Sequence, residues 1–516
     1  MQHTPVLIIG GSLVGLSASL FLAWRGVPHI LVEKHTGSSQ HPRAMGFTET
    51  TMEHYRAVGI ADRIPQAPRG TRLRRVQLAS LSSDWISESD WTPGQAADRS
   101  HDLSPCTGAA IAQDKLEPIL RNAAQEMGAD LRYGVELMNF EQWADKVTAQ
   151  VRSRDSGLEY GITADFLIAA DGAASSIRET LGIHRNGVGH LKTLHSVLFS
   201  CPAADQYLAR GAQQFDIEQE GFRAFLTTYG DSRWVLMLSD GKERSRDELS
   251  AAVRRALGSD MPFDIVTTGQ WEMAGRIADR YSAGRVFLAG DAAHQLPPTR
   301  GGFGANTGID DVWNLAWKLE RVGSGASPIS LLDTYSAERQ PIGLLRHQQT
   351  FSRPDYAHWV GDALKPDALF SNDAMEFGQL IRSSQVIGAP SELPAAASPG
   401  EWKGQPGTRA PHVWIMKSEV RISTLDLFGR EFVFLTANRA WSAGVKVFDL
   451  KVVEVDADVH FLTEASFSDV FGVGAEGATL VRPDGVVAWR TATGVNDGDL
   501  EDLRALVGPR RRTSSM

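Results

Sequence analysis

The chain has 516 residues, of which 42% are hydrophobic and 22% charged, and its formal net charge is −10. This length exceeds what one hydrophobic core supports, so two to four domains are expected. The acidic balance argues against nucleic acid as a partner. The two cysteines are too few for a disulfide framework or a four-thiolate zinc site, which fits a reducing, cytoplasmic setting.

The first residues of the chain predict a strand, a glycine turn, a helix and a second strand. The apolar run 5–9 is typical of a buried parallel strand, residues 14–25 of a helix, and 27–32 of a second strand that Glu33 closes. The uncharged stretch 6–24 has the length of a membrane span, but glycines and serines interrupt it and no basic residue precedes it. A βαβ unit explains this stretch better, and no membrane association is expected.

The turn in this unit, GGSLVG, resembles a dinucleotide-binding loop in which Ser12 replaces the middle glycine of G-x-G-x-x-G. Gly10 permits the tight turn, Gly15 lets helix and strand pack closely, and the helix N-terminus favours phosphate. Glu33 stands where a carboxylate can accept hydrogen bonds from ribose hydroxyls. Ser12 is small, and its hydroxyl could donate to a phosphate oxygen.

A complete match to the same motif occurs at Gly472, Gly474 and Gly477. There a strand pattern follows where a helix is required, and no acidic residue ends a second βα unit. We therefore predict a loop at these glycines.

The remaining pattern predicts, in chain order, a helix near 113–127, strands at 130–134 and 146–153, a strand, turn and helix over 164–182, an antiparallel sheet within 188–272, a strand and turn at 284–294, and helices at 309–322 and 331–349. A segment rich in Pro, Gly, Ala and Ser over 385–411 indicates a domain boundary, and a small α/β unit follows it.

Two further carboxylates lie on turns after buried strands. Asp171 and Gly172 precede Arg178 in ADGAASSIR, and Gly290 and Asp291 open GDAAHQLPP. An isolated Asp-Gly is usually only a turn. Here both turns follow strands of the expected central sheet, where ligands gather at the strand ends.

The set GGSLVG, Glu33, HPRA, QDKLEPIL, DGAASSIR, GDAAHQLPP, GGFGANTGIDD and NLAWKL resembles the class A FAD-dependent aromatic hydroxylases. Para-hydroxybenzoate hydroxylase is their small representative, and the longer branch includes phenol hydroxylase and aromatic polyketide hydroxylases. The resemblance covers residues 4–350 and extends to ATLVRPDGVVAWR near the C-terminus.

The resemblance implies an α/β fold with a Rossmann-like FAD-binding domain, an inserted α+β substrate domain with a mixed or antiparallel sheet, and a C-terminal thioredoxin-like domain. The expected boundaries are 1–185 and 273–395 for the FAD-binding domain with its helical extension, 186–272 with about 70–105 for the substrate domain, and 396–516 for the last domain. The last domain has no cysteine, which excludes thiol redox chemistry there.

The same resemblance implies a set of FAD contacts, which are Gly10, Gly11, Ser12, Leu13, Val14, Gly15, Glu33, Lys34, Arg43, Gln113, Asp171, Asp291, Pro298, Gly304, Ala305 and Asn306. In it the glycine loop holds the pyrophosphate, Glu33 the adenosine ribose and Asp291 a ribityl hydroxyl. Residues 304–306 reach the pyrimidine edge of the flavin from a helix start. The loop before them is one residue longer than in the family, and Arg300, the extra residue, is either a solvated charge or a contact to an anionic ligand.

The implied reaction is hydroxylation of a phenolic or polycyclic aromatic, polyketide-type substrate by a monomer or homodimer. NADPH or NADH reduces FAD, and O2 then gives a flavin C4a-hydroperoxide. No second nucleotide fold is visible, so NAD(P)H is expected as a transient visitor in a surface groove. The alternatives are a Baeyer–Villiger-type or antibiotic-modifying monooxygenase and a non-catalytic flavin-binding partner protein; a halogenase is disfavoured because no W-x-W motif occurs.

The sequence identifies no catalytic base. Its candidates are His54, His294, Tyr229 and Tyr281, each expected to be structural. The candidates for lining the substrate pocket, each equally suited to the core, are Phe225, Trp234, Met237 and, on the oxygen side of the ring, Pro297.

Overall fold

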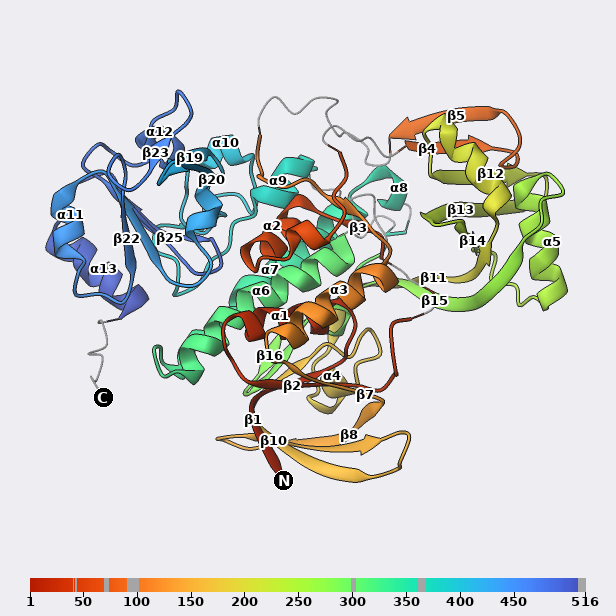
Figure 1. The fold of residues 1–516 in the computed structure, drawn as a ribbon, viewed down its shortest axis with the longest axis horizontal. Coiled ribbons are helices and arrows are strands. Elements are labelled where there is room, and N and C mark those ends of the chain that lie inside the picture. The colour runs from red at the N-terminus through yellow and green to blue at the C-terminus, as the bar shows by residue number, and fades with distance from the viewer. Residues whose placement is uncertain are drawn as a thin grey trace.

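The computed structural model describes residues 1–39, 41, 44–68, 74–90, 102–297, 303–357, 359–360 and 368–508. Figure 1 shows a central nucleotide-binding domain, with a curved middle-domain sheet on its right and a C-terminal domain on its left. Within the described part of the chain, no helix combines the length and the apolar character that a membrane crossing requires.

The central sheet runs in the order β16-β17-β10-β1-β2-β7, and β9 joins β8 to β10. Its strands are β1 (Gln2–Ile9), β2 (His29–Glu33), β7 (Asp130–Tyr133), β8 (Val135–Gln142), β9 (Val147–Ser153), β10 (Glu159–Ala169), β16 (Ser282–Ala283) and β17 (Val286–Leu288). The strands from β17 to β7 are parallel. The sequence pattern did not predict β8, which forms an antiparallel hairpin with β9.

Helices cover this sheet and connect it to the other domains. They are α1 (Leu13–Trp24), α2 (Glu49–Ala57), α3 (Gln113–Glu126), α4 (Ser176–Thr180), α6 (Phe303–Gly323), α7 (Asp333–Phe351), α8 (Pro354–Ala357) and α9 (Asn372–Phe377). Helix α1 is apolar on every side because β1, α3 and α6 all pack against it. This packing accounts for the long uncharged stretch without a membrane.

The middle domain is an eight-stranded sheet in the order β18-β15-β11-β14-β13-β12-β4-β5. Its strands are β4 (Arg74–Leu78), β5 (Trp85–Asp90), β11 (Arg185–Ser200), β12 (Gln214–Gln219), β13 (Phe222–Gly230), β14 (Arg233–Leu238), β15 (Asp264–Ala278) and β18 (His294–Gln295). Neighbouring strands are antiparallel, as predicted, except for β12 and β4. Helix α5 (Arg246–Leu257) contributes to the hydrophobic core on one face.

The C-terminal domain holds a four-stranded sheet in the order β22-β21-β24-β25. Its elements are α10 (Pro399–Trp402), β19 (Trp414–Lys417), β20 (Val420–Ser423), β21 (Val433–Thr436), α11 (Arg439–Gly444), β22 (Lys451–Glu454), β23 (His460–Phe461), α12 (Phe467–Phe471), β24 (Ala478–Val481), β25 (Val487–Thr491) and α13 (Asp497–Val507). β21 and β22 are parallel and the other two pairs antiparallel, which is the thioredoxin arrangement. A second sheet, β20-β19-β23, was not predicted.

The complete glycine motif lies in this C-terminal domain and forms a loop, as predicted. Gly472 follows α12 with φ +62°, which is the left-handed conformation that commonly ends a helix. The strand β24 comes next instead of a helix. The motif therefore lacks the following helix that a phosphate-binding glycine loop requires.

Candidate functional site

The carboxyl ends of four neighbouring parallel strands carry the residues that the sequence singled out. Glu33 ends β2, Gly10 follows β1, Asp171 lies just after β10 and Asp291 just after β17. The order β17-β10-β1-β2 places these four ends side by side along one edge of the sheet. A dinucleotide lying across this edge can meet all four turns at once.

Backbone contacts close the glycine loop and leave no room for a side chain at Gly10 or Gly15. A Cβ on Gly10, whose φ is +106°, would lie 2.2 Å from the carbonyl oxygen of Ala170, and one on Gly15 would lie 1.9 Å from the carbonyl oxygen of Gly10. The Gly11 N–H donates to Glu33 Oε2 at 2.6 Å. The first turn of α1, which follows directly, contains no acidic residue. This cradle at a helix N-terminus fits the diphosphate of FAD.

The Ser12 hydroxyl is directed at α3. It donates to Glu117 Oε1 at 2.7 Å, and Gln113 Nε2 donates to Ser12 Oγ at 2.9 Å and to Glu117 Oε1 at 2.8 Å. Glu117 is buried, and these two donors satisfy one of its carboxylate oxygens. In this structure the Ser12 hydroxyl therefore donates within the protein, and Gln113 contacts Ser12 in the same network.

The turn after β10 holds its carboxylate in a buried position. Asp171 Oδ2 accepts from the Ile177 N–H at 3.4 Å, and Oδ1 is buried with no hydrogen-bond partner among the described residues. Burial raises the pKa of Asp171. Arg178 donates to the carbonyl oxygens of Ala173 and Ala292 at 3.2 Å each, which links this turn to the turn of Asp291.

The turn after β17 (Gly290–Ala292) packs tightly between α1 and α6. Gly290 has φ +60°, and a Cβ on it would lie 2.9 Å from Val14 Cγ2. A Cβ on Gly308 would lie 2.6 Å from the same Val14 atom and 2.8 Å from Gly290 Cα. The half-buried Asp291 thus projects from a turn whose backbone two helices confine.

A buried carboxylate on α6 supports that turn. Asp311 Oδ2 accepts from the Gly290 N–H at 3.2 Å and lies 2.7 Å from His294 Nε2, and Oδ1 accepts from Arg339 Nε at 2.8 Å. Burial is the largest influence and raises the pKa of Asp311, but the charges of His294 and Arg339 bring the pKa below its usual value. The sequence analysis did not single out Asp311, although it quoted the GIDD motif that contains it.

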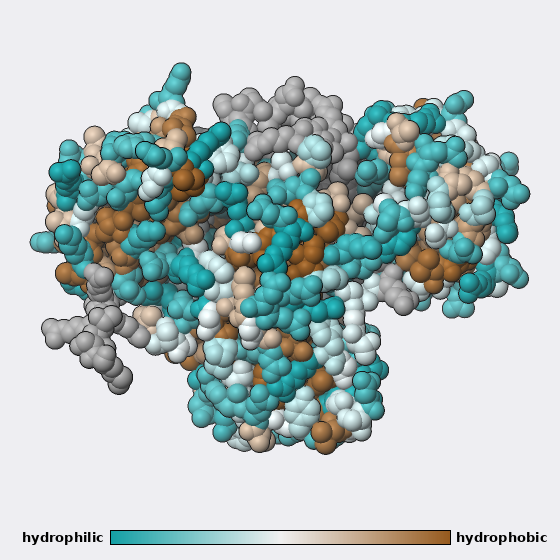
Figure 2. Space-filling model, viewed as in Figure 1, coloured by the Kyte–Doolittle hydropathy of each residue, from teal (hydrophilic) through white to brown (hydrophobic). Residues whose placement is uncertain are grey.

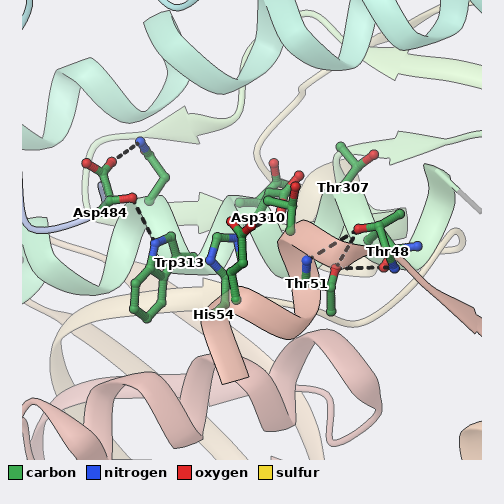
Figure 3. Close-up of polar contacts among 12 residues, drawn as sticks. Thr48, Thr51, His54, Thr307, Asp310, Trp313 and Asp484 are labelled. Atoms are coloured by element: carbon green, nitrogen blue, oxygen red, sulfur yellow. Dashed lines mark hydrogen bonds and ion pairs between the residues drawn. The ribbon is translucent and has the colours of Figure 1, made fainter. Parts of the chain in front are cut away.

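The start of α6 holds Asn306, whose side chain is already engaged. Its Oδ1 accepts from the Thr48 N–H at 3.1 Å and from Thr51 Oγ1 at 2.7 Å, and its Nδ2 donates to the Gly46 carbonyl at 3.2 Å (Figure 3). A flavin contact at this helix start would therefore come from backbone N–H groups of Gly304 to Asn306. Arg43, Pro298 and Arg300 lie outside the described residues. Among the other predicted contacts, Leu13 is buried and Lys34 is exposed.

The middle-domain sheet presents one face to the nucleotide-binding domain. Phe225 lies opposite Met237, Met237 opposite Ser196, and Ser196 opposite Gly269, so the first three side chains share one face. A Cβ on Gly269 would lie 3.3 Å from His41 Cδ2, which places this face beside His41 of the nucleotide-binding domain. Figure 2 shows hydrophobic residues gathered near the middle of the molecule, over the region of α2 and α6.

Two of the pocket candidates have different surroundings from the third. Phe225 and Met237 are half-buried on the open face. Trp234 is fully buried on the other face, where its indole packs against Phe215 and its Nε1 donates to Asp205 Oδ1 at 3.0 Å. Trp234 is a core residue, because strand neighbours an odd number of positions apart point to opposite faces. Pro297, the fourth candidate, is buried close to β18.

The four candidate bases differ in their surroundings. His294 is fully buried against Asp311, and burial raises the pKa values of Tyr281 and Tyr229 above their usual range. His54 contacts Asp310 at 3.1 Å and stacks on Trp313 (Figure 3). It also lines an open pocket between the nucleotide-binding and C-terminal domains. His294 and Tyr281 are fully buried, whereas Tyr229 lies half-buried on β13 of the middle-domain sheet itself.

Two cationic side chains of the middle domain, Arg75 and Lys192, were not identified from the sequence. Arg75 forms a two-bond ion pair with Asp216 at 2.5 and 2.6 Å, and its guanidinium lies 5.0 Å from the Phe225 ring centre. Lys192 is half-buried on β11 opposite Met273 and has no ion-pair or hydrogen-bond partner among the described residues. Burial, and after it the positive charge of Arg75, lower the pKa of Lys192. Scattered Lys and Arg in alternating strands give no sequence signal that would identify them.

Comparison with known proteins supports the assignment that this geometry suggests. The model of the FAD binding domain family matches residues 3–349, and the model of the aromatic-ring hydroxylase C-terminal domain matches residues 403–509. A putative polyketide hydroxylase of Streptomyces halstedii is 37% identical over 95% of this chain and 94% of its own. A 4-methyl-5-nitrocatechol 5-monooxygenase of Burkholderia sp is 35% identical over 95% and 94%.

Solved structures agree with the curated relatives. The ternary complex of aklavinone-11 hydroxylase with FAD and aklavinone superposes with a TM-score of 0.87, at 31% identity, over 98% of this chain and 99% of that one. The parallel sheet with its phosphate cradle and acidic strand ends, joined to an antiparallel sheet, and these matches together identify a flavoprotein oxidoreductase. More particularly, the chain belongs to the FAD-binding aromatic-ring hydroxylase family and is an FAD-dependent monooxygenase.

Proposed function

We propose that the protein hydroxylates a phenolic, fused-ring aromatic of the polyketide type, using NAD(P)H and O2. The observation that carries the proposal is the face of the middle-domain sheet that bears Phe225, Met237 and Ser196, against which His41 of the nucleotide-binding domain lies. Relatives named as polyketide hydroxylases and a structure with bound aklavinone support this substrate class.

Different residues of the chain would bind different parts of FAD. The glycine loop from Gly10 to Gly15 would receive the pyrophosphate, Glu33 the ribose and Asp291 the ribityl chain, while the backbone at the start of α6 would meet the pyrimidine edge. Bound FAD supplies the redox and oxygen chemistry of the family, which no side chain can perform. The protein contributes position and the exclusion of water.

On the substrate side, Lys192 is proposed to attract the phenolate form of the substrate. Its ammonium is half-buried without a carboxylate partner among the described residues. Arg75, in contrast, already pairs with Asp216. A cation beside the ring oxygen favours the deprotonated phenol, which is the more electron-rich and reactive ring. The ion-paired Arg75 and the ring of Phe225 would form the wall beside it.

For NAD(P)H, we propose the arginines around the Asp171 turn. Arg185 donates to the Ala173 carbonyl at 2.9 Å, the same carbonyl that Arg178 contacts. Burial, and then repulsion by Arg178 and Arg276, lower the pKa of Arg185. Glu272 and Glu179 offset part of this repulsion, and an anion bound beside Arg185 would relieve the rest. Arg185→Gln is expected to raise the KM for NADPH about tenfold with little change in FAD affinity.

The deciding experiment follows NADPH oxidation and oxygen uptake with a panel of phenols and polycyclic phenols, with mass analysis of the products. A fused-ring phenol that gains one oxygen from labelled O2 at a ring carbon is the expected result. A product with oxygen inserted next to a ketone would show that the reaction is a Baeyer–Villiger oxidation and not a hydroxylation. If FAD binds but no aromatic compound accelerates NADPH oxidation, the proposal is wrong.

A further inference from the structure

A buried group of charges joins the C-terminal domain to the nucleotide-binding domain. Glu338 of α7 accepts from Arg482 through both carboxylate oxygens, at 2.6 and 3.0 Å, and from Lys318 Nζ at 2.8 Å. Arg482 directly follows β24 of the C-terminal domain, whereas Lys318 belongs to α6. All three side chains are fully buried. The carboxylate therefore links two domains through contacts that water does not reach.

A second carboxylate, Asp484, balances the charges of this group. Asp484 accepts from Arg482 at 2.5 Å and from Asn314 Nδ2 at 3.1 Å, and its backbone carbonyl accepts from Trp313 Nε1 at 3.1 Å (Figure 3). Two cations thus meet two anions. Burial lowers the pKa of the Lys318 ammonium to about 8, although Glu338 opposes that effect. The group depends on its carboxylates to remain charged and buried.

Arg339, the next residue of α7, contacts the part of α6 that supports the turn after β17. Arg339 Nε donates to Asp311 Oδ1 at 2.8 Å, and Arg339 Nη2 donates to the Thr307 carbonyl at 3.3 Å. Asp311 in turn accepts from the Gly290 N–H, next to Asp291. Glu338 therefore contacts the C-terminal domain, and the next residue, Arg339, contacts the carboxylate that supports the turn after β17. On α6 the corresponding residues, Asn314 and Asp311, are one helical turn apart.

We propose that Glu338 is a positioning residue for FAD, and that the C-terminal domain, through Arg482, forms part of the support of the flavin site. By fixing α6 against α7, the Glu338 carboxylate keeps Asp311 in place under the Gly290 N–H. Without it, Lys318 and Arg482 would be two buried cations with one remaining anion, and the helices would have to separate to hydrate them. The proposal rests on the proposed contact between Asp291 and the ribityl chain.

The test compares Glu338→Gln with Asp449→Asn. Asp449 Oδ2 pairs with Arg321 Nη1 at 3.3 Å across the same domain interface, but at the far end of α6. Both variants are titrated with FAD by flavin fluorescence, and circular dichroism of the bound flavin is recorded. Exchange of the Gly290 amide hydrogen is measured in the apoprotein. Glu338→Gln is expected to raise the Kd for FAD at least tenfold, change the flavin dichroism and speed Gly290 exchange, whereas Asp449→Asn stays within twofold.

Two additional variants separate the role of Glu338 from folding and from the proposed function. Glu338→Gln combined with Lys318→Met removes one charge of each sign, and it is expected to recover most of the FAD affinity. Asp291→Ala tests the proposed ribityl contact by itself. If Asp291→Ala weakens FAD binding but folded Glu338→Gln binds FAD as the wild type does, the positioning role is refuted. If Asp291→Ala leaves FAD binding unchanged, the proposed ribityl contact fails instead, and the positioning role fails with it.

Discussion

The hydroxyl of Ser12 provides a sharp test of the glycine loop, because the serine stands where the motif has a glycine and its hydroxyl is hydrogen-bonded to α3. Ser12 Oγ and Gln113 Nε2 are the donors to Glu117 Oε1, at 2.7 and 2.8 Å, and Glu117 is buried. A hydrogen bond to a charged group contributes about 1.5–3 kcal/mol. Ser12→Ala should therefore destabilise the apoprotein by about that amount. At about 2 °C per kcal/mol, this corresponds to a fall of about 3–6 °C in Tm.

The assay is a double-mutant cycle on the apoprotein, with thermal unfolding of wild type, Ser12→Ala, Glu117→Gln and the double variant. We expect a coupling free energy of at least about 1 kcal/mol between the two sites. The FAD dissociation constant of Ser12→Ala, or of Ser12→Gly, should change less than about threefold because the hydroxyl faces α3. An unchanged apoprotein Tm together with a tenfold loss of FAD affinity would show instead that the hydroxyl serves a phosphate.

Three further changes probe other parts of the structure. Burial lowers the pKa of His347 and His412 to about 4, so between pH 4 and 6.5 the unfolded chain binds more protons than the folded chain. The free energy of unfolding therefore decreases as the pH is lowered through that window. Urea unfolding should show a loss of about 2 kcal/mol for each histidine from pH 7 to pH 5, and a glutamine at either position should remove its share. Gly308→Ala places a methyl group 2.6 Å from Val14 of α1, so it should lower the free energy of unfolding by about 1–3 kcal/mol and weaken FAD binding. Gly323→Ala, at the open end of the same helix, should change neither quantity. Equal effects of the two variants would contradict the packing argument. Lys192→Met should raise the KM for a fused-ring phenol and move the pH optimum of hydroxylation upward, and an unchanged pH profile would remove it from the substrate site.

The sequence was sufficient for the parts of the site that are local along the chain. Gly10, Gly15 and Glu33 lie within one βαβ unit, so strand, helix and acidic residue could be read together. Asp171 and Asp291 were recognisable because each follows a short apolar run that reads as a buried strand. Local pattern thus predicted that these residues lie at the ends of neighbouring strands.

The parts that the sequence could not predict depend on contacts between distant segments. Ser12 and Glu117 are 105 positions apart, and the packing of α1 on α3 brings them together. The faces of Trp234 and Met237 follow from strand parity, but both residues are apolar, so hydrophobicity alone could not say which face is the core. Lys192 and Arg75 lie on strands separated by three others in the sheet, and their mutual influence appears only once the sheet is folded.

Packing, as much as phosphate binding, determines which positions of the glycine loop must be glycine. At the outer two motif positions a Cβ would collide with backbone, 2.2 Å from the Ala170 oxygen for Gly10 and 1.9 Å from the Gly10 oxygen for Gly15, and backbone cannot move aside cheaply. At the middle position the Cβ of Ser12 points toward α3, where Glu117 provides a partner. A side chain is therefore tolerated at the one position that phosphate approach alone would have forbidden, and the same reasoning predicts that Gly15→Ala disrupts the loop even in the apoprotein.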